Sequence, residues 1–506
     1  MHTLTSRLSR LATGVALASA ALAAGASLAA ADATSDYNAG LALGTQAYQY
    51  GVPLLDTERI FTSSTQVSVC NPLTGHGPAN QFCNARDLAN ATEHTVNAPN
   101  NDTLYSLAWL DLSKQPQVLH APAIKHRFWE FELVDPWTNN FFNMTSAHKQ
   151  LGKGDFDVTG GGNWAVVGPG FTGRLPRGAI RVNAPYSRVW VIGRTYIRGP
   201  SDLAGVHRIQ AKYAITPLSR FGTGYTAPRP KHVVTGSTDT TIPGTQPGED
   251  PLTCYAALGR EMLRFPAPAR DRPLLNRIRA IGVGPGLSPA TAHLSAATLQ
   301  GLRDAVTQGP AKLTVKLLAL YSQEFAAHNG YLVGDLGDWG TNYTLRAIGD
   351  KVGVGGQRAS IATYPFALLD DTKAPLTGSR RYVLHIPKTS LPIPVKAFWS
   401  LTLYDSSSYF VPNPLNRWVI NNRSLLRRNA DGSIDMYVQN NRPSSPAQVS
   451  NWLPAPQTGT GFRLIWRLYD LDNAVAGVLD GSGWQPPPIQ PCSAAGVGSL
   501  GTACAS

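Results

Sequence analysis

Two short stretches with the same pattern decide the fold of this chain: FWEFELVD at residues 128–135 and FWSLTLYD at residues 398–405. In both, large apolar side chains alternate with other residues, which is the period of a half-buried β-strand, and both end on an aspartate. Each is followed by an apolar run with an arginine beside an aromatic residue, VWVIGRTY at 189–196 and FRLIWRLY at 462–469. We interpret this pattern as a repeat of two related β-sandwich halves. Chance similarity between two amphipathic strands is the alternative.

The rest of the chain predicts a mainly β protein with a helical insert. Short runs rich in Val, Ile, Trp and Phe, separated by Gly, Pro and Asn, occupy residues 90–235 and 356–480. We therefore predict two antiparallel, jelly-roll-like β-sandwiches. The expected boundaries are a signal peptide at 1–31, an N-terminal sandwich with a leading helix at 36–235, a helical insert at 250–355, a C-terminal sandwich at 356–485 and a tail at 486–506.

Helical spacing of apolar residues predicts the individual helices. The leading helix covers 36–50, where Gly51 and Pro53 are expected to end it. Ser288-Pro289 fits a helix start, with serine as the cap and proline at the first position. The helices expected in the middle of the chain are 253–265, 290–307, 312–327 and 338–351.

The N-terminus has the pattern of a secretory signal peptide. Arg7 and Arg10 precede an apolar, alanine-rich stretch, Val15–Leu28, and small residues at 29–33 fit a cleavage site. An uncleaved membrane anchor is the alternative. No other stretch approaches the ~18 apolar residues of a membrane span. We predict a secreted or periplasmic protein with no stable membrane insertion.

The cysteines agree with export. Cys70 and Cys83 bracket a segment rich in Gly, Pro and Asn, and Cys492 and Cys504 bracket a similar tail. We predict these two local disulfides, typical of an oxidising compartment, and a buried free thiol at Cys254.

The formal net charge of +12 becomes +10 (12 − 2) when Arg7 and Arg10 leave with the signal peptide. The excess is scattered, and no basic helix or arm stands out, so we predict no nucleic-acid partner. A small-molecule or polysaccharide ligand is expected, and an anionic partner remains open. The sequence does not indicate the oligomeric state.

Common catalytic motifs are missing. The chain has no G-x-S-x-G elbow, no P-loop and no H-E-x-x-H helix, and His120 and His126 lack partners at zinc-ligand spacing. We predict no cofactor and no metal centre. A calcium site at Asn100, Asp102 and Asp135 stays open as a weaker hypothesis, because calcium prefers oxygen ligands.

Three aspartates are the candidate catalytic residues: Asp102 in a polar turn, and Asp135 and Asp405 at the ends of the repeated strands. Paired carboxylates serve general acid–base chemistry, including glycosidic hydrolysis. Alternatively, each sets a turn or pairs with an arginine such as Arg194 or Arg467. The supporting binding candidates are polar or aromatic: Asn100, Tyr105, Asn139, Tyr404, Arg423, Asn451 and Trp452.

Several motifs together resemble a known family. They are NAPNNDTLYS at 97–106, DPWTN at 135–139, the 398–405 strand, Asn413-Pro414, Arg417-Trp418, Asp431-Gly432-Ser433, NWLPAP at 451–456 and Arg467-Leu468-Tyr469. This set resembles bacterial exported proteins with a DUF1254 domain followed by a DUF1214 domain. The resemblance implies two sandwiches and no settled activity.

For function, we expect an exported hydrolase or lyase that acts on a polar, sugar-like or anionic substrate with paired carboxylates. The alternative is a non-catalytic carbohydrate-binding or envelope-structural protein. An enzyme should gather the three aspartates around one cleft, whereas a binder should not.

Overall fold

The computed structural model describes residues 5–92, 94, 97–147, 155–236, 241–471 and 475–505, without the side chains of 5–31, 155–156 and 475–476. The predicted signal peptide therefore lies outside the residues whose side chains are described. In the described part of the chain, no helix combines the length and the apolar character that crossing a membrane requires.

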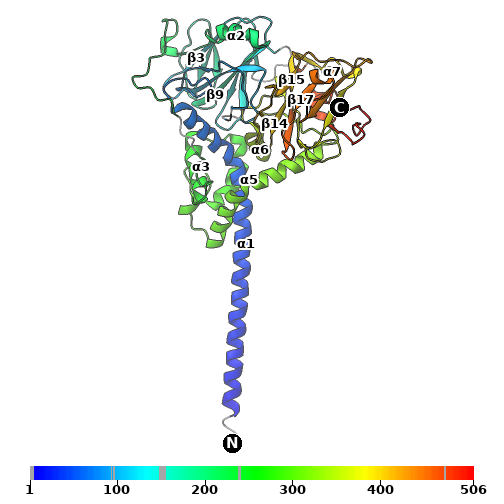
Figure 1. The fold of residues 1–506 in the computed structure, drawn as a ribbon. Helices are drawn as coiled ribbons and strands as arrows, with labels where there is room; N and C mark the ends of the chain where they lie inside the picture. Colours follow the sequence, from blue (N-terminus) through cyan, green and yellow to red (C-terminus); the bar gives the residue numbers. More distant parts are fainter. Residues whose placement is uncertain are drawn as a thin grey trace. The chain divides into compact units, whose positions relative to one another are not determined.

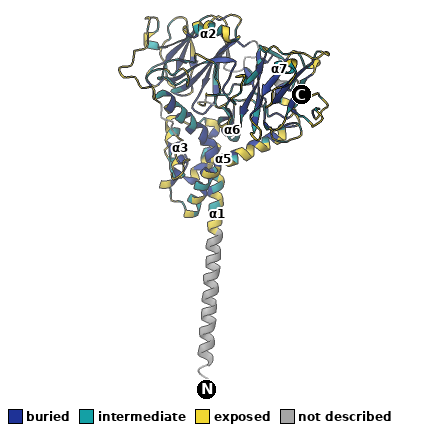
Figure 2. Ribbon diagram, in the orientation of Figure 1, coloured by how far each residue is buried: buried dark blue, intermediate teal, exposed yellow. Residues whose placement is uncertain are grey.

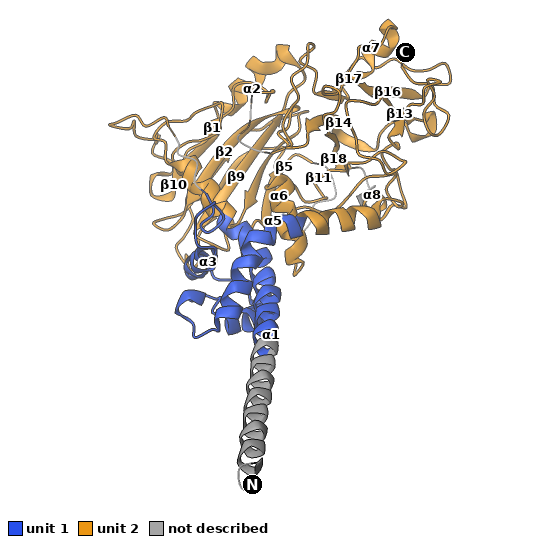
Figure 3. Cartoon of the chain, turned by 60° about the horizontal axis from the view of Figure 1, so that its bottom comes forward, with its two compact units in different colours: residues 1–55, 241–313 blue, residues 56–240, 314–506 orange. Residues whose placement is uncertain are grey.

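The chain divides into two compact units, drawn in different colours in Figure 3. Unit 1 comprises residues 1–55 and 241–313, and unit 2 comprises residues 56–240 and 314–506. Unit 1 is helical. Its elements are α1 (Thr5–Thr65) up to residue 55, α3 (Leu252–Arg264), η3 (Ala269–Asp271), α4 (Arg272–Ile278), η4 (Arg279–Ile281), η5 (Pro289–Thr291) and the first part of α5 (Ala296–Glu324).

The described part of unit 2 forms four sheets in two sandwiches (Figure 1). The first sandwich consists of two sheets. One has the strand order β1 (Cys83–Asn84), β2 (Thr103–Asp111), β9 (Arg188–Tyr196), β4 (Trp129–Val134), β5 (Asn140–Thr145) and β6 (Asp155–Asp157). The other has the order β10 (Ala214–Pro217), β3 (Gln117–Ala121), β7 (Gly162–Val167) and β8 (Ala179–Asn183). Their facing side chains form one apolar core that includes Trp129, Phe131 and Trp164.

The second sandwich is built in the same way. One sheet has the strand order β11 (Ala362–Thr363), β18 (Phe462–Leu471), β14 (Val395–Asp405) and β15 (Val419–Asn421), and β12 (Phe366–Ala367) also pairs with β18. The other sheet has the order β17 (Trp452–Pro454), β16 (Ile434–Gln439), β13 (Tyr382–Ile386) and β19 (Gln490–Pro491). Leu401, Leu403 and Trp466 lie in the core between these sheets.

The remaining helices of unit 2 are short. They are the last part of α1, η1 (Pro200–Asp202), α2 (Leu203–Gln210), η2 (Leu218–Arg220), the last part of α5, α6 (Tyr343–Gly353), η6 (Lys388–Ser390), α7 (Pro446–Ser450) and α8 (Val475–Asp480).

The prediction of a mainly β fold with two sandwiches and a helical insert is confirmed. The central strands pair antiparallel, as predicted, but the pairs β5–β6, β7–β8 and β16–β17 at sheet edges are parallel.

The two quoted stretches occupy equivalent strands. β4 lies between β9 and β5, and β14 lies between β18 and β15. The register also agrees, because Glu130 faces Arg194 across the first pair and Ser400 faces Arg467 across the second. These are matching positions of the two repeats, which supports the repeat over chance similarity.

The two sandwiches meet through aromatic residues at matching positions of the repeats. Phe128 and Tyr196 come from the first half, and Phe398 and Tyr469 from the second. Phe398 stacks on Tyr469, with ring centroids 4.3 Å apart, and on Tyr196, at 4.6 Å. Phe128 meets Tyr469 edge-on at 5.1 Å and Phe398 at 5.7 Å. Each half thus presents the same pair of rings to the other.

Two helix boundaries were wrong. α1 does not end at Gly51 or Pro53 but continues to Thr65. A proline inside a helix removes one hydrogen bond and crowds the preceding turn. Here the neighbours Tyr50, Val52, Leu54 and Leu55 are buried, so apolar packing outweighs that loss. Figure 2 shows the described part of α1 changing from exposed at its start to mostly buried further along.

The segments 290–307 and 312–327 form a single helix, α5, which runs through Pro310. Ser288-Pro289 starts only the 3₁₀ turn η5, and the serine side chain makes no capping hydrogen bond. α5 begins later, where the Ser295 hydroxyl accepts the N–H of Thr298 at 3.1 Å. The other two predictions hold approximately, as α3 and α6.

Both predicted disulfides are present. Cys70 bonds Cys83 and Cys492 bonds Cys504, with Cα atoms 5.1 and 6.1 Å apart. Cys254 is free and buried, and burial raises the pKa of its thiol to about 12. It is therefore protonated and unreactive at neutral pH.

Replacing Phe398 by alanine should lower the free energy of unfolding of unit 2 by about 3–5 kcal/mol, because a fully buried ring with three aromatic neighbours is lost. Urea denaturation followed by tryptophan fluorescence measures this loss. Leu425→Ala is the control, since Leu425 is 90% exposed and should change stability by no more than about 0.5 kcal/mol. Equal midpoints for the two variants would contradict the proposed role of the aromatic contact.

Candidate functional site

A cavity of about 350 Å³ lies within unit 2, on the faces of the two sheets that point away from their sandwich cores. Strand alternation places its residues there. On β18, Ile465, Arg467 and Tyr469 line the cavity, whereas Leu464, Trp466 and Leu468 lie in the sandwich core. β2 and β9 contribute their outward residues in the same way. The volume falls in the usual range for small-molecule sites.

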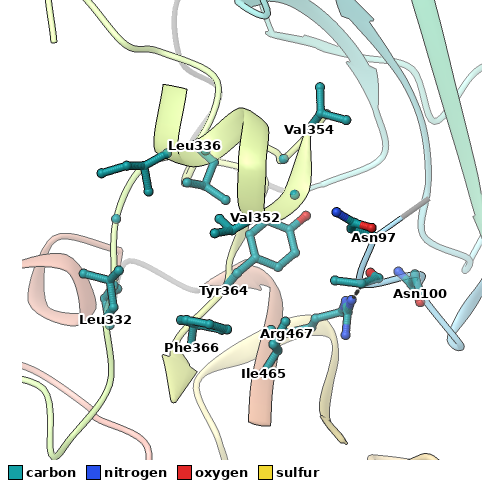
Figure 4. Close-up of a pocket in the computed structure, with 18 of the residues that line it drawn as sticks. Asn97, Asn100, Leu332, Leu336, Val352, Val354, Tyr364, Phe366, Ile465 and Arg467 are labelled. Atoms are coloured by element: carbon teal, nitrogen blue, oxygen red, sulfur yellow. Dashed lines mark hydrogen bonds between the residues drawn. The ribbon is translucent and has the colours of Figure 1, made fainter. Parts of the chain in front are cut away.

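Most of the wall is apolar. α5, α6 and the segment between them contribute to this wall. In Figure 4, Leu332 and Leu336 of that segment and Val352 of α6 lie beside the cavity. Phe366 and Ile465 add apolar surface from the second sandwich, and Trp190 and Ile192 from the first. The aliphatic residues of the helices and their connecting segments are Leu317, Leu320, Leu332, Val333, Leu336, Leu345, Ile348, Val352 and Val354.

Polar groups gather at one part of the cavity. In Figure 4, Tyr364 lies between the apolar Leu336 and Val352 and the polar Asn97, Asn100 and Arg467. The hydroxyls of Tyr364 and Tyr469 are 3.4 Å apart, and the Asn100 amide donates to Tyr469 at 3.1 Å. The backbone N–H of Asn100 donates to the hydroxyl of Tyr105 at 3.2 Å. Burial raises the pKa of Tyr469 to about 12, so this phenol keeps its proton at neutral pH.

Arg467 is a buried cation with neutral partners. Its guanidinium donates to the Thr402 hydroxyl at 3.0 Å and to the Ala98 carbonyl at 2.7 Å. Among the described residues, no carboxylate lies within ion-pair distance of it. Burial acts to lower the pKa of Arg467, but the electrostatic effect of Tyr404 and Tyr469 raises it above the ordinary value. The group stays charged.

Arg194, at the matching position of the first repeat, also lines the cavity but is neutralised. It donates to Glu130 at 3.0 Å and to Glu132 at 2.7 Å, and both glutamates are buried. Gln357 donates to the same two carboxylates at 2.7 Å. Burial raises the pKa of Glu132 to about 7, although Arg194 lowers it.

Asp135 and Asp405 form turns. Asp135 Oδ1 accepts the N–H groups of Trp137 and Asn139, both at 2.9 Å, and Asp405 Oδ1 accepts those of Ser407 and Tyr409 at 2.8 and 2.9 Å. In both turns the third residue after the aspartate has a positive φ, 62° at Thr138 and 70° at Ser408. Asp370 and Asn413 hold turns of the same kind. Neither Asp135 nor Asp405 lines the cavity.

Asp102 links the two sandwiches. Its Oδ1 accepts from Asn421 at 2.8 Å and from Arg423 at 3.1 Å. Arg423 also donates to the carbonyl of Ile197, so it ties the second half to the first. Asp102 does not line the cavity, and its buried Oδ2 has no hydrogen-bond partner among the described residues.

The other predicted binding residues divide between the cavity and the framework. Asn100 and Tyr105 line the cavity. Asn139 supports the Asp135 turn, and Tyr404 donates to the Pro99 carbonyl at 2.6 Å. Asn451 bridges backbone groups of Arg427 and Asp435, and the Trp452 indole donates to the Gln439 carbonyl. Of the predicted catalytic and binding residues, this cavity therefore includes Asn100 and Tyr105 and not the others.

The sequence analysis did not select Arg194, Arg467, Tyr364 or Tyr469 for the site. The sequence pattern that could have identified the two arginines and Tyr469 lies in the repeat itself, because β9 and β18 each carry an arginine two residues before a tyrosine, R-T-Y and R-L-Y.

Within the described residues, no group of three or more His, Cys, Asp or Glu side chains could hold a metal ion. Of the residues considered for calcium, Asn100 Oδ1 accepts the N–H of Asp102, Asp102 Oδ1 accepts from Asn421 and Arg423, and Asp135 Oδ1 holds a turn.

The fold and cavity define a class: a double β-sandwich protein with an amphipathic cavity lying on the outer faces of its two central sheets. Residues 79–217 match the family model described as "Protein of unknown function (DUF1254)", and residues 361–473 match "Protein of unknown function (DUF1214)". The chain carries these two domains in that order, which confirms the resemblance.

Two solved structures are similar to the chain. The VPA0106 protein of Vibrio parahaemolyticus aligns over 90% of this chain and 100% of its own, with 20% identity and a TM-score of 0.59, which shows a shared fold. A putative uncharacterized protein from Burkholderia cenocepacia aligns over 92% of this chain and 97% of its own, with 14% identity and a TM-score of 0.40. A comparison with curated proteins found no match.

Asp135 generates a pH prediction. Burial raises its pKa from 3.8 to about 6, although Asn139 and Trp137 lower it. Because the folded state binds the proton more tightly than the unfolded state, wild-type stability should fall as pH rises from about 4 to about 6. Asp135→Asn keeps an acceptor oxygen for the turn, as Asn413 does, and should weaken this fall. Urea unfolding across this pH range measures the slopes, and identical slopes would contradict the assignment.

Proposed function

We propose that this protein is an exported binding protein that holds a small amphipathic molecule in the cavity of unit 2. The observation that carries the proposal is the lining: a mostly aliphatic wall with a cluster of buried polar groups at one part. Such sites bind ligands through apolar contact and orient them through a few placed polar groups. The two disulfides support an extracytoplasmic, secreted or periplasmic location.

The lining favours binding over the hydrolase or lyase expected from the sequence. Asp102, Asp135 and Asp405 do not line the cavity, and their hydrogen bonds serve turns and the link between the sandwiches. A carbohydrate ligand also fits poorly, because sugar hydroxyls need many polar partners and the wall offers mainly Leu, Val and Ile side chains.

Filling the cavity tests the proposal. Gly334 and Gly353 line it, and a Cβ added at either position meets no atom within 4 Å. Gly334→Phe and Gly353→Phe should therefore be tolerated in the fold and should weaken binding of the neutral apolar dye Nile red by about tenfold or more, because a ring occupies the ligand's space. Fluorescence titration measures the affinity.

Gly160→Phe is the matched control, because a Cβ there also meets no atom within 4 Å and this residue does not line the cavity. It should bind the dye like the wild type, and circular dichroism should show all variants folded. If the folded cavity variants bind the dye as tightly as Gly160→Phe, or if the wild type binds no dye and no alkyl compound, the proposed function is wrong.

A further inference from the structure

We infer that the cavity selects ligands with a carboxylate head, bound by Arg467, on an apolar body. This inference rests on the proposed function and names the ligand class for the same site. Two observations support it. The two repeats differ in the partners of their matching arginines, and the polar groups around Arg467 have more unused hydrogen-bond donors than acceptors.

The repeat provides an internal comparison. In the first half, Arg194 is paired with Glu130 and Glu132, which both lie on the neighbouring strand β4. The matching positions on β14 are Ser400 and Thr402. Arg467 donates to Thr402 just as Arg194 donates to Glu132, but Thr402 brings no charge. The second half therefore keeps the arginine and lacks both of its carboxylates.

Asp102 acts on Arg467 electrostatically but does not form the ion pair that Arg467 lacks. Asp102 acts on Arg467 through its charge, but its Oδ1 is bound to Arg423 at 3.1 Å and to Asn421 at 2.8 Å. Arg467 is almost wholly buried, at 3% exposure, and it lines the cavity. A buried charge without a counter-charge is costly, and a ligand anion in the cavity would supply one.

Apart from Asn97, whose side-chain amide carries both donors and an acceptor, the polar side chains beside Arg467 offer hydrogen-bond donors rather than acceptors. Asn100 Oδ1 is already taken by the N–H of Asp102, at 2.6 Å. The Tyr105 hydroxyl accepts from the Asn100 N–H, so its own hydrogen is left to donate. The bond between the hydroxyls of Tyr364 and Tyr469 uses one hydrogen of the pair and leaves the other. An ionised carboxylate, which only accepts hydrogen bonds, matches this set.

The charge balance favours a carboxylate over a phosphate. A phosphate monoester carries close to two negative charges at neutral pH and would need a second free cation. The other arginine of the lining, Arg194, already faces two glutamates, and the remaining charged residue of the lining, Glu324, would repel an anion. Arg467, which has no carboxylate partner among the described residues, carries one positive charge and so balances one carboxylate.

A ligand series on the wild-type protein tests the inference directly. Dodecanoic acid, dodecanol and dodecyl phosphate share one apolar body and differ in the head group. At pH 8, displacement of Nile red should show the acid binding at least about tenfold more tightly than the alcohol and more tightly than the phosphate. Equal binding of acid and alcohol would overturn the carboxylate assignment and leave the proposed function standing, because the alcohol still binds.

Two variants test whether Arg467 causes the preference for the acid over the alcohol. Arg467→Gln removes the charge, and Thr402→Glu restores the carboxylate that the first repeat has at this position. Both should abolish the preference for the acid over the alcohol while Nile red still binds. Thr402→Gln is the matched comparison, since it adds nearly the same volume without charge and should lose less of the preference than Thr402→Glu. A preference that survives in both Arg467→Gln and Thr402→Glu would overturn the role of Arg467.

Discussion

Two sheets of this chain are buried on both faces, and this constraint governs the rest of unit 2. The sheets that contain β9 and β18 pack on a partner sheet with one face and meet the other half of the unit with the opposite face. Along each strand, alternate residues serve the two environments. This explains why Val189 and Val191 are core residues while Trp190 and Ile192 line the cavity.

The same constraint places charged groups in a dry region. On β4, the alternation that sends Trp129, Phe131 and Leu133 into the sandwich core sends Glu130 and Glu132 to the other face. Arg194 can neutralise them because it lies directly opposite Glu130 in the register. In the second half, the serine and threonine of β14 leave Arg467 with neutral partners. The halves thus share a framework and differ in electrostatics.

The sequence predicted what depends on local pattern and on matched spacing. The repeated strands, both disulfides and the helix α3 follow from alternation, from short cysteine spacing and from helical periodicity. The predicted helix boundaries at Pro53 and near Pro310 were wrong because both prolines lie inside helices whose apolar neighbours are buried, such as Leu54 for the first and Val306 and Leu313 for the second. A local sequence pattern does not report such tertiary packing. The aspartates misled differently. D-P-W-T-N and D-S-S-S-Y are sequences of an aspartate-capped turn, so a strand-end aspartate was better evidence for a turn than for a catalytic acid.

The cavity could not be predicted because its residues come from strands and helices that lie far apart in the sequence and meet only when both halves are folded. The polar residues of the cavity nonetheless indicate whether they serve stability or the binding of a ligand. If these residues served stability alone, apolar side chains of similar size would do so at lower cost, since a buried ionic group is often no more stabilising than a well-packed hydrophobic one. The glutamates that offset this cost at Arg194 are absent at Arg467, while the arginine is kept. A buried cation surrounded by spare donors is explained more simply by an anion that arrives from outside than by the fold itself.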